Sequence, residues 1–150
     1  MVNKKELIAE KFWKFWISIL DDLEIKNGCI LVEGPHDVKI LINLQVPEER
    51  IIMISDKSYE SLVSEITRRY QLVYIFTDFD SQGNTKAKRI MSRLCGYRIE
   101  VHDLRSMFRS FLSKFGFKSI GKVEELKKFS LLLPQPNIIT LRRIRKELHL

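Results

Sequence analysis

Residues 29–37, CILVEGPHD, contain the repeating unit of the fold, because four apolar residues are followed by a Glu-Gly turn and then by a segment of helical periodicity. The pattern recurs along the chain, most clearly in LVYIFTDFDSQG (72–83), whose apolar run lacks polar alternation. Such a run is typical of a strand covered on both faces. We expect strands at 29–32, 51–54, 72–76 and 98–101, each followed by a helix, at 37–44, 59–69, 85–94 and 104–115. Strand–helix alternation predicts a three-layer α/β fold with about four parallel strands.

The segments on either side of this core are predicted to be helical. Within residues 1–27, Phe12, Phe15, Trp16 and Leu23 recur at helical spacing, and packing on the chain's own core is favoured over docking on a partner. Residues 28–115 form the α/β domain. Residues 116–150 form a helical extension, with helices expected at 123–129 and 138–148. With 150 residues, we expect one structural domain overall.

Composition narrows the class of protein. The chain is 45% hydrophobic and 30% charged with six Gly and four Pro, which excludes a disordered or fibrous chain. Neither a membrane-spanning run of about 18 uncharged apolar residues nor a secretory leader is evident. Cys29 and Cys95 stand singly among apolar neighbours, so we expect reduced core cysteines in a cytoplasmic protein.

Charge is distributed unevenly along the chain. The net charge is +7, but residues 1–83 carry 10 basic and 14 acidic residues (−4), and residues 84–150 carry 16 and 5 (+11). A basic half indicates a polyanionic partner such as nucleic acid, and a solvated surface is the alternative. The nucleic-acid candidates are Lys86, Lys88 and Arg89, and near the C-terminus Arg142, Arg143, Arg145 and Lys146. For this second set, a merely solvated surface is an equal alternative.

Acidic residues follow two of the expected strands. Glu33 and Asp37 follow the first, and Asp78 and Asp80 follow the third. Ligands of open parallel sheets bind beyond the carboxyl ends of the strands, so these carboxylates should converge in one crevice. Neither motif contains a lysine, and such a cluster calls for a cation; all-oxygen ligands suit Mg²⁺, with Mn²⁺ as the substitute. The alternative for each motif alone is structural, because an Asp at a helix start is usually an N-cap.

Together the two motifs, ILVEGPHD (30–37) and YIFTDFDSQG (74–83), resemble the signature motifs of the Toprim domain. This domain occurs in topoisomerases, bacterial-type primases, old-family nucleases, recombination proteins and a ribosomal RNA maturation nuclease. The resemblance covers about residues 28–115. In size and organisation the chain is most similar to small archaeal Toprim proteins and to the RNA maturation nuclease.

The resemblance implies roles for individual residues. Glu33 would act as general acid or base, and Glu33, Asp78 and Asp80 would bind Mg²⁺. Asp37 matches the family's aspartate after the glutamate, as a further ligand or a support for one, and Gly83 matches the glycine that often follows the aspartate pair.

The function implied is Mg²⁺-dependent phosphoryl transfer on nucleic acid, most of all strand cleavage of the nuclease type. The alternative is a non-catalytic, metal-dependent nucleic-acid-binding module of a primase, repair or RNA-processing assembly. The sequence leaves open whether the substrate is RNA or DNA and how many ions bind. It also leaves open whether the chain is active alone and whether it has a protein partner or forms a homodimer. His36 is expected to face solvent, with a substrate contact as the alternative. Four tyrosines are expected to be structural, namely Tyr59, Tyr70, Tyr74 and Tyr97.

Overall fold

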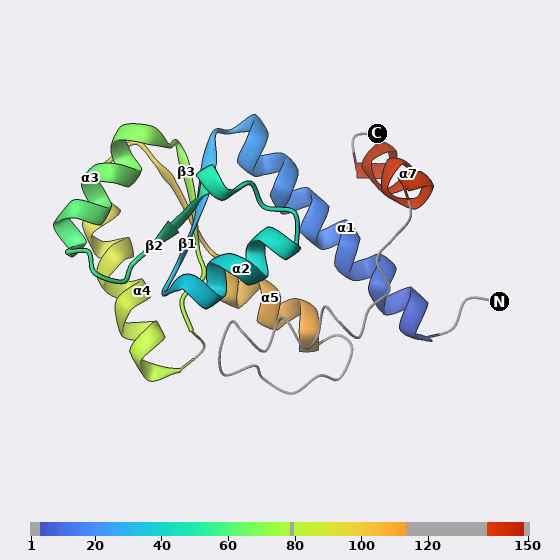
Figure 1. Ribbon diagram of the computed structural model, residues 1–150, viewed down its shortest axis with the longest axis horizontal. Helices are drawn as coiled ribbons and strands as arrows, with labels where there is room; N and C mark the ends of the chain where they lie inside the picture. The colour runs from blue at the N-terminus through green and yellow to red at the C-terminus, as the bar shows by residue number, and fades with distance from the viewer. Residues whose placement is uncertain (1–3, 79, 114–137, 149–150) are drawn as a thin grey trace.

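The computed structural model describes residues 4–78, 80–113 and 138–148 (Figure 1). At its centre is a sheet of four parallel strands in the order β2-β1-β3-β4. The strands are β1 (Gly28–Val32), β2 (Ile51–Met53), β3 (Leu72–Ile75) and β4 (Glu100–Asp103). The described helices are α1 (Lys4–Ile25), α2 (Pro35–Asn43), α3 (Tyr59–Arg69), α4 (Ser81–Leu94), α5 (Leu104–Ser113) and α7 (Ile138–Leu148), with a short 3-10 turn, η1, at Glu48–Arg50.

The strands separate two apolar layers because successive side chains point to opposite faces. Ile30 and Val32 of β1 face a core built with α1, α2, α5 and α7. Cys29 and Leu31 face a second core built with α3 and α4. Figure 1 shows α3 and α4 together on one side of the sheet and α1 on the other. The predicted three-layer α/β class is thereby confirmed.

The N-terminal helix packs on the chain's own core, as expected. Phe12 and Trp16 are fully buried, and the Trp16 indole Nε1 donates a hydrogen bond to the Leu44 carbonyl oxygen at 2.7 Å. α7 lies along α1, with Ile144 buried in the same core. The two ends of the described chain therefore contribute to one hydrophobic core with the sheet.

Several expected boundaries differ from the structure by one to four residues, most clearly at α4 and β4, and the helix expected at 123–129 lies outside the described residues. α4 begins at Ser81 instead of residue 85, since Asp80 caps it. β4 begins at Glu100 instead of residue 98, because its register is set by pairing with β3, where Leu72 lies opposite Glu100. As an edge strand with no fully buried residue, β4 has a weak sequence signal.

The two cysteines lie in different environments. Cys29 is buried in β1, and burial raises the pKa of its thiol to about 12. Cys95 is exposed where α4 ends, so the prediction that both lie in the core is wrong for Cys95. Across residues 4–78, 80–113 and 138–148, none of the helices has the length and apolar character needed to cross a membrane.

Candidate functional site

The site lies at the carboxyl edge of the sheet, where β1 and β3 end side by side. The two strands pair from Gly28 opposite Leu72 to Leu31 opposite Ile75. Each strand is followed by one of the acidic motifs, so pairing of the strands brings residues 33 and 78 together although 45 positions separate them. Glu33 and Asp78 line the same pocket, and the contact between them joins the Glu33 carboxylate to the Asp78 backbone N–H.

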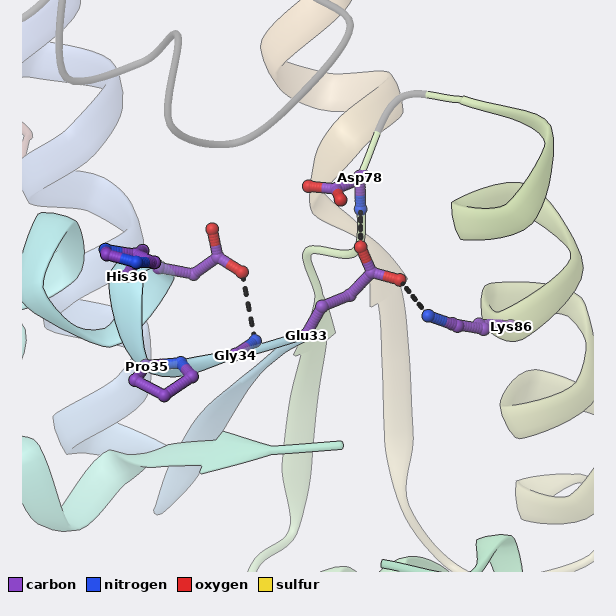
Figure 2. Close-up of a pocket in the computed structure, with 7 residues that line it drawn as sticks. Glu33, Gly34, Pro35, His36, Asp78 and Lys86 are labelled. Atoms are coloured by element: carbon purple, nitrogen blue, oxygen red, sulfur yellow. Dashed lines mark hydrogen bonds and ion pairs between the residues drawn. The ribbon is translucent and has the colours of Figure 1, made fainter. Parts of the chain in front are cut away.

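Glu33 is held by two partners (Figure 2). Its Oε2 accepts a hydrogen bond from the Asp78 backbone N–H at 3.3 Å, and its Oε1 forms an ion pair with the Lys86 Nζ at 2.7 Å. The Glu33 side chain is 14% exposed and that of Lys86 is 37% exposed. Lys86 reaches this position from the second turn of α4.

These contacts set the charge of the pair. Burial by itself would raise the pKa of Glu33, but hydrogen bonds with Asp78 and Lys86 and the charge of Lys86 lower it overall. The hydrogen bond to Glu33 raises the pKa of Lys86. Near neutral pH the site therefore contains an ionised carboxylate and a protonated ammonium group.

The β3–α4 loop is tightly closed. The Asp80 Oδ1 accepts a hydrogen bond from the Gly83 backbone N–H at 2.7 Å, which makes Asp80 the N-cap of α4. The Thr77 hydroxyl donates to the Gly83 carbonyl at 2.8 Å. A Cβ on Gly83 would collide with the Asp78 backbone, so only glycine fits here. The loop thus holds the N-terminus of α4 directly behind Asp78.

The β1–α2 loop turns its own carboxylate inward. The Asp37 Oδ2 accepts a hydrogen bond from the Gly34 backbone N–H at 3.1 Å, and Asp37 is buried. Gly34 is the N-cap of α2, so Asp37, three residues later, satisfies the backbone N–H of the cap residue. His36 is exposed beside it, in accordance with the expectation that it faces solvent. Together with Asp78 and Lys86, residues 33–37 line a pocket of about 270 Å³.

The structure places the two aspartates of the second motif differently and gives the carboxylates a partner. Asp78 and Asp80 both follow β3, which ends at Ile75, but Asp80 is the exposed N-cap of α4. The carboxylates also do not lack a cation, since Lys86 pairs with Glu33. Among the described residues, no three His, Cys, Asp or Glu side chains are grouped so that they could hold a metal ion as they stand.

Arg105 is a buried arginine that was not predicted from the sequence as part of the site. Arg105, 4% exposed, donates from Nε and NH2 to the two carboxylate oxygens of Asp103, at 3.0 and 2.9 Å. Its NH1 donates to the Asn84 Oδ1 at 2.7 Å. These bonds, with burial opposing them, lower the pKa of Asp103. The arginine therefore ties the first turn of α4 to the end of β4. In the sequence, the one local signal for this pairing is the spacing of Asp103 and Arg105, two residues apart at the end of β4.

The basic candidates occupy two separate helices. Lys88 and Arg89 are exposed on α4, next to Lys86. The terminal set lies on α7, where Arg143 pairs with Glu10 of α1 at 2.9 Å and Arg145 with Asp21 at 3.5 Å. Arg142 and Lys146 are exposed on the same helix.

Fold and site define a three-layer α/β protein with an acid–lysine pocket at the carboxyl edge of its parallel sheet. The chain belongs to the UPF0292 family: it is 35% identical over 122 residues to a UPF0292 protein of Thermococcus gammatolerans, covering 80% of this chain and 86% of that protein. A Pyrococcus abyssi relative is 34% identical over 120 residues, with 80% and 86% coverage. A solved protein structure from Aquifex aeolicus has a TM-score of 0.58 at 27% identity, covering 74% of this chain and 94% of that one. No protein-family model matches the sequence.

Proposed function

We propose that this protein carries out Mg²⁺-dependent phosphoryl transfer on nucleic acid, as a nuclease-type enzyme of the cytoplasm. The observation that carries the proposal is the meeting of Glu33 and Asp78 from adjacent strands, beside Lys86 on a helix without acidic residues. The resemblance of both motifs to those of Toprim domains supports the same chemistry.

The donor chemistry fits a hard divalent ion. Glu33, Asp78 and Asp80 would hold Mg²⁺ or Mn²⁺ through carboxylate oxygens, with Asp37 bracing the loop behind Glu33. For these side chains to converge on an ion, Lys86 has to leave Glu33. The cap bond of Asp80 uses Oδ1, so Asp80 would bind the ion through Oδ2. A bound ion would stabilise negative charge on the phosphate and on the attacking and leaving oxygens.

The chain's own residues supply the remaining steps. Glu33 is ionised, so it can accept the proton of an attacking water and later return it to the leaving oxygen. Lys86, once released from Glu33, can bind a phosphate oxygen. The backbone N–H groups in the first turn of α4 favour an anion at the same place.

One observation favours the second candidate, a non-catalytic nucleic-acid-binding module. Asp80 caps α4, Asp37 binds the backbone N–H of Gly34 at the start of α2, and Glu33 is neutralised by Lys86, so each has a structural role as well. Turnover separates the two candidates.

The test combines cleavage with metal-dependent stability. We expect the pure protein to cleave labelled RNA or DNA with Mg²⁺ or Mn²⁺, and the Asp78→Ala/Asp80→Ala variant to be inactive. We also expect divalent ions to raise the melting temperature of wild type more than that of Asp80→Asn. Asparagine caps helices as well as aspartate does, so this variant removes charge and keeps the cap.

Two results would contradict the proposal. Cleavage that survives the double substitution would place the activity elsewhere or in a contaminant. A wild type whose melting temperature ignores both ions would contradict the metal site.

A further inference from the structure

Lys86 separates two hollows on the surface. One is the pocket of Glu33 described above, of about 270 Å³, and the other, of about 280 Å³, lies between α4 and the first residue of α3. We call the second hollow the α4 groove; it is lined by Tyr59, Ser81, Gln82, Thr85, Lys86 and Arg89. Because Lys86 lines both, a chain-like ligand that reaches the first pocket can continue into the α4 groove.

The α4 groove combines an aromatic ring with cations. The guanidinium of Arg93 lies 4.9 Å from the centre of the half-buried Tyr59 ring, and that of Arg89 lies 6.0 Å away. Residues 85, 89 and 93 are spaced by four, so they share one face of α4. α4 contains no acidic residue, and Glu60, the acid next to Tyr59, lines a neighbouring hollow with Arg93.

A positive groove with an aromatic platform is the arrangement that binds single-stranded nucleic acid, since cations follow the phosphates while bases stack on rings. Bases inside a duplex are already stacked and cannot reach a half-buried ring. The arginines over Tyr59 can turn to neighbouring phosphates, which exposes the ring face to a base. Arg93 lies about 10 Å beyond Lys86 along the helix axis, so this face of α4 can contact a short stretch of a nucleic-acid strand.

We propose that a single-stranded segment of nucleic acid lies in the α4 groove, with phosphates on Lys86 and Arg89 and a base on the Tyr59 ring. This inference rests on the proposed function and names its substrate class. The strand that enters the Glu33 pocket is then unpaired on the α4 side.

The experiment measures binding without cleavage. Fluorescence anisotropy is recorded in EDTA with short labelled single strands of RNA and DNA and with the matching duplexes. Tyr59→Leu keeps an apolar group against the core and should weaken single-strand binding about 5- to 150-fold, the range for loss of one stacked base. Tyr59→Phe keeps the ring and should bind nearly as wild type does, and duplex binding should change little in either variant.

A charge pair provides the second arm. Arg89→Glu should weaken single-strand binding and flatten its salt dependence, whereas Arg68→Glu, the same change at the exposed far end of α3, should do neither. The melting temperature of Tyr59→Leu shows whether that variant folds. If it does not fold, the comparison of Arg89→Glu with Arg68→Glu tests the proposal. Tighter binding of single-stranded RNA or of single-stranded DNA would show which sugar the groove prefers. Equal affinity for both supports a groove that contacts only phosphate and base.

The outcomes separate this inference from the proposed function. Unchanged single-strand binding in folded Tyr59→Leu, or equal losses for single strand and duplex, would overturn the inference and leave the cleavage proposal standing. Tyr59-dependent binding by a wild type that never cleaves would support the inference and contradict the enzymatic proposal. A wild type that binds neither form would overturn both.

Discussion

Helices α4 and α7 have similar charge and different surroundings. Each carries four basic residues: Lys86, Lys88, Arg89 and Arg93 on α4, and Arg142, Arg143, Arg145 and Lys146 on α7. On α7, two arginines pair with acids of α1, and Lys14 of α1 pairs back with Glu147. On α4, one lysine pairs with Glu33 in the pocket, and two arginines lie over Tyr59.

The difference shows that a basic run acquires its role from what it packs against. The cations of α7 help attach that helix to α1, around the buried Ile144. The cations of α4 border the pocket and the α4 groove. We therefore expect α4 to interact with nucleic acid and α7 to contribute mainly to the fold.

The largest expected effect is on catalysis. Glu33→Gln should lower the cleavage rate about 10²- to 10⁴-fold, because an amide cannot move the proton. Its matched control is Glu10→Gln, which removes a partner of Arg143 on the α7 side and should leave the rate unchanged. Single-turnover cleavage at saturating protein measures both. A Glu33→Gln variant that cleaves at the wild-type rate would restrict Glu33 to a structural or ligand role.

The next effect concerns how α4 is anchored. Gly83→Ala should destabilise the fold by about 1–3 kcal/mol, because its Cβ meets the Asp78 backbone and the loop has to shift. Gly34→Ala is the control, since a Cβ there meets nothing within 4 Å and its backbone is extended. Urea unfolding compares the two. Equal stability of both variants would mean that close packing of Gly83 on the Asp78 backbone does not anchor α4.

Charge reversal compares the two helices directly. Lys88→Glu/Arg89→Glu should reduce the slope of log affinity against log salt by about 1.5 units, as expected for two lost phosphate contacts. Arg143→Glu/Arg145→Glu makes the same charge change beside Glu10 and Asp21, so it should lower the melting temperature and leave the slope nearly intact. Anisotropy titrations and thermal unfolding test this. Equal losses of slope would place nucleic acid on both helices.

The smallest effect is a pH dependence. The pKa of Glu33 is lowered, so its pairing contributes stability above the unfolded carboxyl value of about 4.3 and loses it as pH falls through the folded value. The raised pKa of Lys86 maintains the contribution until the solution is strongly alkaline. Lys86→Met should therefore lower stability near pH 7, and the deficit should shrink below pH 4.

The size of that deficit is limited by solvent, since Lys86 is 37% exposed, to about 1 kcal/mol or less. Lys88→Met serves as the control for loss of a surface charge on α4. Urea unfolding at several pH values gives both curves. A deficit that stays constant from pH 7 to pH 3 would show that Lys86 stabilises the protein by packing instead of by its charge.

The order of elements and the parallel three-layer class could be predicted from local patterns in the sequence. Apolar runs such as residues 72–76 and the amphipathic periodicity of 59–69 are local properties, and local periodicity is what separates strand from helix. The sequence also indicated that Glu33 and Asp78 share one edge of the sheet, because both follow strands in a parallel alternation.

The charge pairs, in contrast, depend on how elements far apart in the sequence pack together. Lys86 lies 53 positions from Glu33 and Arg143 lies 133 positions from Glu10, and no local pattern encodes such distances. Asp80, expected from the sequence as a metal ligand, is also the N-cap of α4, because Gly83 allows α4 to start immediately behind Asp78. Electrostatic partners depend on separation in space, and in this protein the packing of α4 against the sheet and of α7 against α1 sets that separation.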